Sequence, residues 1–259
     1  MRAVPTAGLA LAGALLAASA LLAGCGVGAA ASALKGAEAS SAPASPSPTA
    51  SDTSSPTPTP TPSPSPTPTF SARIQPIPDA LRQRMINVGS WHRGCPVPIG
   101  HLRLITLRYW GFDGETHKGN LVVARGAARR VVRVFHALFD RRYPIRRMRL
   151  IENFAADDHK SMAADNTSAF NGRYVSGTRR WSMHAYGIAI DINPVENPYV
   201  SGGYVSPPAG RAYADRSLRR RGMIHAGGKV VQIFAAIGWE WGGSWRPARD
   251  YQHFSANGR

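Results

Sequence analysis

The stretch that decides the fold of this chain is residues 182–191, SMHAYGIAID, which is completed near the C-terminus by residues 250–254, DYQHF. His184 precedes a short apolar run with the character of a strand, and Asp191 lies near the end of that run. A carboxylate among isoleucines has to be paired or bound to a metal ion, because an isolated buried charge is costly. Two histidines and one carboxylate are a common catalytic zinc set, which leaves a fourth position for water. The spacing alone is weak evidence, but the apolar surroundings of Asp191 favour a metal site.

Both stretches resemble the signatures of a known family. The second is similar to a signature in which an acidic residue stands three positions before the last histidine. The two motifs follow in the family's order, and the resemblance covers roughly residues 145–255. Five residues of the first stretch match the SxHxxGxAxD signature of the D-alanyl-D-alanine carboxypeptidase-like metallopeptidases, the VanY/VanX and endolysin-type group: Ser182, His184, Gly187, Ala189 and Asp191.

The resemblance implies a set of site residues. His184, Asp191 and His253 would bind Zn2+, and Asp250 would act as the general base. Asp250 departs from the dipeptidase members, which carry Glu there, whereas Asp is usual in the branch that includes phage endolysins. Side chains three residues apart on a strand point to opposite faces. A bend at residues 251–252 is therefore required if Asp250 and His253 are both to reach the metal.

The family also places a substrate-orienting arginine upstream of its first histidine. Arg173, in the polar stretch TSAFNGR (167–173), is the candidate, and Arg147 and Arg149 are its rivals. A solvated arginine of a very basic protein is an equally good interpretation of Arg173. Four aromatic residues near the motifs are expected in the core, with the lining of a groove as the alternative: Tyr186, Trp239, Trp241 and Trp245.

The implied activity is zinc-dependent hydrolysis of peptidoglycan stem peptides, in the manner of a D-alanyl-D-alanine carboxypeptidase. Two alternatives stay open, an L-alanyl-D-glutamate-type endopeptidase and an inactive cell-wall-binding module. The metal ligands do not fix which peptide bond is cut. An inactive module would lack a ligand or the base, and neither is missing from this sequence.

The pattern of apolar residues predicts an α+β domain with a small, mostly antiparallel sheet flanked by helices. Helical spacing is found over residues 77–88, 127–142 and 229–237. Residues 155–183 and 195–224 read as irregular, and the second of these is a long loop of the kind that often carries function. Strands are expected at 102–110, 120–124, 147–154, 186–192, 239–241 and 250–254.

The N-terminus has the features of a targeting segment. Arg2 precedes an almost wholly apolar run at residues 8–23, as in a secretory signal peptide. The run ends in LAGC (22–25), which resembles the lipobox of bacterial lipoproteins, so residues 1–24 are expected to be the signal peptide and Cys25 the lipidated residue. An ordinary signal peptide or a short membrane anchor is the alternative.

Residues 25–69 are expected to be a disordered linker, because their Pro, Ser and Thr cannot form a core. The proline-rich part should be extended at about 3.1 Å per residue. Residues 70–259 are then the zinc metallopeptidase domain, exported and lipid-anchored to the outer face of the cytoplasmic membrane, within the cell wall. Cys95 would be a single thiol with no disulfide partner, most simply a structural residue.

The positive charge belongs to the expected domain. Residues 1–69 hold four charged residues that cancel, so the formal net charge of +16 resides in residues 70–259. Such a field attracts polyanions, which makes anionic wall polymers possible partners beside the stem peptides. A nucleic-acid binder is the rival class, but the signal peptide argues against it and no nucleic-acid-binding motif is present.

Overall fold

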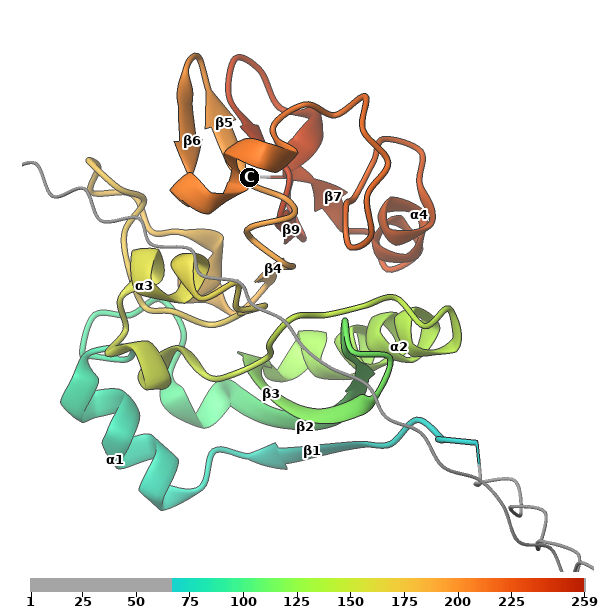
Figure 1. Ribbon diagram of the computed structural model, residues 1–259. Helices are drawn as coiled ribbons and strands as arrows, with labels where there is room; N and C mark the ends of the chain where they lie inside the picture. Colours follow the sequence, from blue (N-terminus) through green and yellow to red (C-terminus); the bar gives the residue numbers. More distant parts are fainter. Residues whose placement is uncertain (1–66, 259) are drawn as a thin grey trace, which may run out of the picture. The chain divides into compact units, whose positions relative to one another are not determined.

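The computed structural model describes residues 67–258. The signal peptide, Cys25 and residues 25–66 of the expected linker lie outside the described residues. Among the residues described, no helix combines the length and apolar character that crossing a membrane requires. Between them they form helices and small antiparallel sheets, which confirms the expected α+β class (Figure 1).

The first sheet has the order β1–β2–β3, formed by Ala72–Pro76, Leu102–Trp110 and Thr116–Ala124. Helix α2 (Arg125–Asp140) covers one face of it, where Ile105 and Leu107 pack with Val131 and Phe135. Helix α1 (Asp79–Val88) contributes Met85 to a smaller cluster with Leu102 and Leu104, which point to the other face. Successive side chains of β2 therefore point to opposite faces of the sheet and enter two different core clusters, as expected for a strand.

The second sheet carries the C-terminal motif. Its order is β4–β9–β7, from Ala189–Asp191, His253–Ser255 and Glu240–Trp241. Helix α4 (Lys229–Ala235) packs beside it, and the rings of Phe234 and Phe254 stack 3.9 Å apart. Ile190 and Phe254 belong to the same core cluster as the buried face of α2. The strands that bear the two motifs are thus built on the main core.

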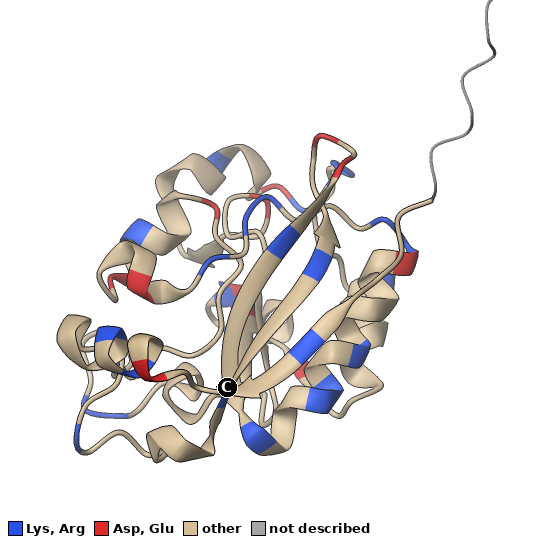
Figure 2. Ribbon diagram, turned by 90° about the horizontal axis from the view of Figure 1, so that it is seen from below, with Lys and Arg blue, Asp and Glu red and all other residues tan. Residues whose placement is uncertain are grey.

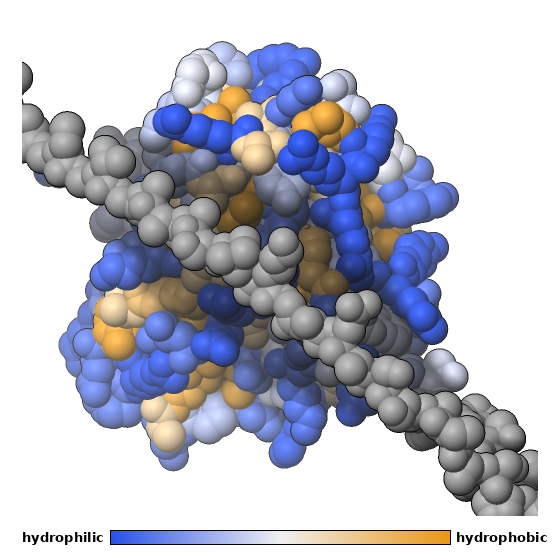
Figure 3. Space-filling model, in the orientation of Figure 1, coloured by the Kyte–Doolittle hydropathy of each residue, from blue (hydrophilic) through white to orange (hydrophobic). Residues whose placement is uncertain are grey.

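A third sheet has the order β6–β5–β8, from Tyr204–Ser206, Tyr199–Ser201 and Arg249–Asp250. The remaining elements are short: helix α3 (Asp158–Ala163) and the 3-10 helices Ile99–His101, Ile151–Phe154, Met183–Tyr186, Pro208–Tyr213 and Gly242–Ser244. The face seen in Figure 3 is mainly hydrophilic, and the apolar residues on it form small separate patches.

Several expected elements differ from those observed. The strand predicted at 147–154 is wrong, because this segment is irregular and ends in the 3-10 helix Ile151–Phe154. Its backbone is held by other groups: the Asn166 side chain bonds both the N–H and the C=O of Arg149, and Thr167 N donates to Arg147 O. The strand expected over 186–192 is confined to β4, and the supposed loop 195–224 contains the β5–β6 hairpin.

The remaining boundaries moved by a few residues. β3 begins at Thr116 rather than at residue 120, and the strand expected at 250–254 is divided between β8 and β9. β1 was not expected, because only Ile74 and its neighbours mark it and its side chains are mostly exposed. A short edge strand of this kind leaves little apolar pattern in the sequence.

Candidate metal centre and active-site cavity

Three elements bring the motif residues together. His184 lies in the 3-10 helix Met183–Tyr186, Asp191 ends β4 and His253 begins β9. In the antiparallel pairing of β4 with β9, Asp191 stands directly opposite His253. Side chains that are directly opposite in such a pair share one face, which accounts for the meeting of these two residues.

Ser182 and Gly187 shape the turn that presents His184. The Ser182 hydroxyl accepts a hydrogen bond from His184 N at 3.3 Å, which caps the 3-10 helix. Gly187 ends that helix with φ +66°, and a Cβ there would lie 2.5 Å from the backbone nitrogen of Ala124. The same nitrogen donates to Gly187 O, so the turn is fixed against the end of β3. Local structure therefore explains why the motif has a serine and a glycine at these two positions.

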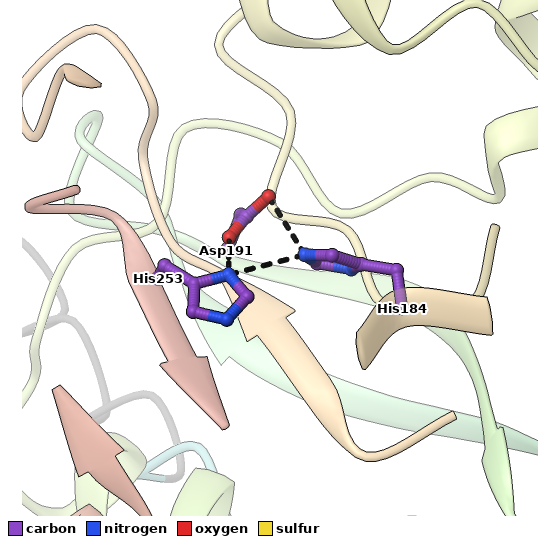
Figure 4. A group of neighbouring side chains, drawn as sticks. All are labelled: His184, Asp191 and His253. Carbon is purple, nitrogen blue, oxygen red and sulfur yellow. Dashed lines mark hydrogen bonds and ion pairs between the residues drawn. The ribbon is translucent and has the colours of Figure 1, made fainter. Parts of the chain in front are cut away.

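The three side chains converge on one point (Figure 4). His184 Nε2 lies 3.2 Å from His253 Nδ1 and 3.2 Å from Asp191 Oδ2, and His253 Nδ1 lies 3.0 Å from Asp191 Oδ1. Tetrahedral ligands at 2.0–2.1 Å from zinc lie about 3.3 Å from one another. All three residues are buried, and among the described residues they form a group able to hold a metal ion. The donor types and their separations fit zinc.

The surroundings hold these donors in the form that a metal needs. His184 Nδ1 lies 2.5 Å from Ala169 O, so it donates its proton there and leaves the Nε2 lone pair toward the group. Backbone hydrogen bonds between Ser168 and Asp191, at 2.9 and 3.0 Å, fix the end of β4. Burial raises the pKa of Asp191, but its interactions with His184 and His253, hydrogen bonds among them, outweigh burial and hold that pKa below its usual range, which favours the carboxylate form.

Asp250 lies beside the metal group, on β8 and opposite Tyr199. Residues 251 and 252 form a bend, so the chain passes from the third sheet to the second between Asp250 and His253, and the required bend is present. Asp250 Oδ1 is buried and has no hydrogen-bond partner within the described residues. Burial, and then the charge of Asp191, raise the pKa of Asp250 to about 7.

A cavity of about 970 Å³ opens on this group. Its lining includes the three candidate ligands, Asp250 and Arg173. Arg173 Nη2 lies 2.7 Å from Asp158 Oδ2, at the start of α3, and this ion pair fixes the guanidinium. Its rivals Arg147 and Arg149 do not line the cavity. The structure thus brings one of the three candidate arginines to the site.

Sequence reasoning missed several residues of the cavity wall. Asp158 comes from α3, while Tyr199 and Tyr204 come from the β5–β6 hairpin, inside the segment read as a loop. Gly242, which does not line the cavity but packs against the site, was also missed: a Cβ there would lie 2.7 Å from Asp250 O and 3.2 Å from His253 Cβ. The Gly-Gly pair at 242–243 was the one sequence signal for such a close approach.

Of the four aromatic residues near the motifs, two lie in the core, one lines the cavity and one does neither. Trp239 and Trp241 are buried in the main core, as expected. Trp245 lines the cavity, and its ring centre lies 5.2 Å from that of His253. Tyr186 is half-buried and does not line the cavity.

Comparisons with known proteins bear on the same region. Residues 176–256 match the model of the D-alanyl-D-alanine carboxypeptidase family. No curated protein and no solved structure matches the chain. The match includes both motifs and begins after Arg173, so it starts later than the expected residue 145 and does not include that arginine. The family resemblance is confirmed: over residues 176–256 this chain is similar to the D-alanyl-D-alanine carboxypeptidase family of peptidases.

Proposed function

We propose that the protein is a zinc peptidase that hydrolyses the stem peptides of peptidoglycan, in the manner of a D-alanyl-D-alanine carboxypeptidase. One observation supports this above the others: three buried donors 3.0–3.2 Å apart meet in a cavity beside Asp250, whose buried Oδ1 has no hydrogen-bond partner among residues 67–258. The family match supports a peptidase, and the bond that it cuts is our inference.

Zinc held by His184, Asp191 and His253 would supply an acidified water and a polarised scissile carbonyl. We assign to Asp250 the removal of a proton from the attacking water, and its buried Oδ1, which has no hydrogen-bond partner among the described residues, supports this role. The same carboxyl group then delivers this proton to the leaving amine. A pKa near the working pH suits both transfers, and that of Asp250 is raised to about 7.

Arg173 is proposed to bind a carboxylate of the substrate. Asp158 holds Nη2 of the guanidinium and Tyr174 O accepts a hydrogen bond from Nη1 at 3.3 Å, whereas Arg173 Nε is buried without a hydrogen-bond partner in the described part of the chain. A guanidinium with its plane fixed loses little entropy when its remaining N–H groups bind a carboxylate. The free carboxyl group at the end of a stem peptide is the ligand that a carboxypeptidase recognises in this way.

Endopeptidase activity remains the second candidate because of the cavity's size. About 970 Å³ is at the upper end for small-ligand pockets, and it accommodates more than a dipeptide. Digestion of purified muropeptides by the zinc-loaded chain, followed by mass analysis, separates the two. Loss of a terminal D-alanine supports the carboxypeptidase, whereas splitting of the stem supports the endopeptidase. If no muropeptide is cut, with or without zinc, the proposal is wrong and the result favours an inactive cell-wall-binding module.

A further inference from the structure

The outer face of α2 carries a row of arginines that the proposed catalysis does not use. Arg125, Arg129 and Arg133, here called the α2 arginine row, are all exposed. They follow one another at every fourth position, so they share one side of the helix with about 6 Å of axial rise between them. Figure 2 shows Lys and Arg at several turns of this helix. None of the three lines the cavity.

Nothing in the described structure neutralises this row. Residues 116–139, which comprise β3 and nearly all of α2, contain no Asp or Glu. The ion pairs that Lys and Arg make among residues 67–258 lie elsewhere, at Asp79, Asp157, Asp158, Asp165 and Glu196. The three guanidinium groups make no hydrogen bond within the described part of the molecule, in contrast to Arg141, which bonds Ala137 O.

The row is also unfavourable for the helix that bears it. Like charges four residues apart repel each other on a helix surface. Arg125 is the first residue of α2, where the helix dipole disfavours a cation, and the first turn contains no acidic residue. The buried face of α2 holds the helix in place despite this repulsion. The fold itself does not require the row, which indicates a partner that supplies negative charge.

We propose that the α2 arginine row binds a linear polyanion whose charges are phosphodiesters, namely an anionic polymer of the cell wall. The choice of the wall rests on the proposed function, which places the substrate there. Guanidinium groups favour phosphate oxygens because their forked N–H groups match them. A straight row of single charges suits a chain with one charge per repeat.

The composition of the row argues against nucleic acid. Single-stranded nucleic acid is held by basic grooves together with aromatic side chains on which the bases stack. Residues 125–133, RGAARRVVR, contain no aromatic side chain. Along residues 125–133 the row therefore offers charge without a stacking surface, and the ring of His136, three residues beyond Arg133, is already stacked on Phe70. This arrangement fits a polymer that has no bases. Binding there would keep the enzyme on the wall while the separate cavity stays open to peptide.

The test measures binding of the full-length chain to poly(glycerol phosphate) over a range of salt concentrations. The variant R125Q/R129Q/R133Q keeps good helix formers on α2. We expect it to bind at least tenfold more weakly at physiological salt. The slope of log affinity against log salt should fall by about 2, at about 0.7 for each lost phosphate contact. Cleavage of a small soluble muropeptide should not change.

A control variant, R73Q/R108Q/K118Q, removes the same charge from the other face of the first sheet. Arg108 pairs with Lys118 and Arg73 with Thr106, on the side opposite Ile105 and Leu107, which face α2. We expect the affinity of the control for poly(glycerol phosphate) to fall by less than threefold. An equal loss of affinity in the two variants would mean that the net positive charge of the whole domain attracts the polymer. The α2 site would then be rejected.

Three other results would also overturn the site: no binding by the wild type, tighter binding of an oligothymidylate than of poly(glycerol phosphate), or capture only by phosphatidylglycerol vesicles. The second would point to nucleic acid and the third to a membrane surface. Asp250→Asn should bind the polymer as the wild type does. If the wild type binds the polymer but cuts no muropeptide, the proposed function fails while the α2 site stands.

Discussion

The two ring nitrogens of His184 have different partners, and this leaves one of them facing the candidate metal site. Nδ1 is fixed on Ala169 O, whereas Nε2 faces Asp191 and His253. His184→Ala should therefore remove a ligand and leave two donors, which bind zinc far more weakly. We predict one zinc per chain in the wild type and loss of most of it in the variant, measured by elemental analysis. His159→Ala, in the same cavity wall, is the control and should keep its zinc. Full retention by His184→Ala would contradict the ligand assignment.

The role of Asp250 can be distinguished from that of the candidate ligands, because a variant that lacks only the base should keep zinc but lose activity. Asp250→Asn should keep zinc, since Asp250 is not one of the three converging donors. It should lose about 10²–10⁴-fold in kcat, the usual worth of a positioned general base. Unchanged turnover would exclude Asp250 as the base.

The pH profile provides a second test of Asp250. A base works in its ionised form, so activity should rise with pH as Asp250 loses its proton. Its pKa of about 7 sets the upper limit of this inflection, because a bound dication would lower it. We predict a rise in kcat/KM with an inflection at or below about 7, which is absent in Asp250→Asn. The same inflection in the variant would assign it to another group.

Arg173 should affect binding more than the chemical step. Arg173→Lys keeps the charge but loses the planar fork that a carboxylate requires. The expected result is a raised KM with a smaller change in kcat, measured on a peptide with a free C-terminal carboxylate. Arg180→Lys, in the same cavity wall, is the matched control and should leave KM nearly unchanged. A wild-type KM in Arg173→Lys would leave the arginine with a structural role alone, through its ion pair to Asp158 and its hydrogen bond to Tyr174 O.

At the scale of the elements, Gly187 tests how the turn before β4 places His184. Gly187→Ala puts a Cβ 2.5 Å from Ala124 N at φ +66°. The left-handed backbone and the clash together should lower the free energy of unfolding by about 2–4 kcal/mol. Gly126→Ala, in the first turn of α2, is the matched control, because a Cβ there meets nothing within 4 Å. Its free energy of unfolding should rise by about 0.5–1 kcal/mol. Urea unfolding measures both, and equal effects would contradict the role given to the turn.

The same scale shows how far the sequence could predict the structure. The convergence of the three candidate metal ligands was predictable because Ser182 and Gly187 act locally and β4 and β9 each carry a motif. The cavity wall was not, since Tyr199 reaches Asp250 only through the pairing of β5 with β8, which leaves no local pattern. Residues 147–154 show the reverse case, in which a local pattern is present but the element is not. Their side chains alternate as in a strand, but the Asn166 side chain occupies the N–H and C=O of Arg149 that would otherwise pair with a neighbouring strand.

At the scale of the whole molecule, the groups proposed for catalysis and for wall binding depend on one core. The apolar face of α2 packs in the same cluster as Ile190 and Phe254, the neighbours of two candidate ligands in β4 and β9. The arginine row lies on the opposite side of that helix. The two proposed functions should therefore be separable by mutations in the cavity and in the arginine row, whereas a substitution in this shared core should affect both.

The proposed place of this domain in the cell depends on Cys25, which lies outside the described residues. LAGC at 22–25 resembles a lipobox, and two or more acyl chains on its cysteine would anchor a protein stably. Cys25→Ser should move the protein from the detergent phase to the aqueous phase in detergent phase separation of whole cells. Cys95→Ser is the matched control, because Cys95 is a half-buried thiol of the domain and its loss should not alter partitioning. If Cys25→Ser partitions as the wild type does, the anchor is not a lipid on this residue. An uncleaved apolar segment at residues 8–23 would then be the simplest membrane attachment.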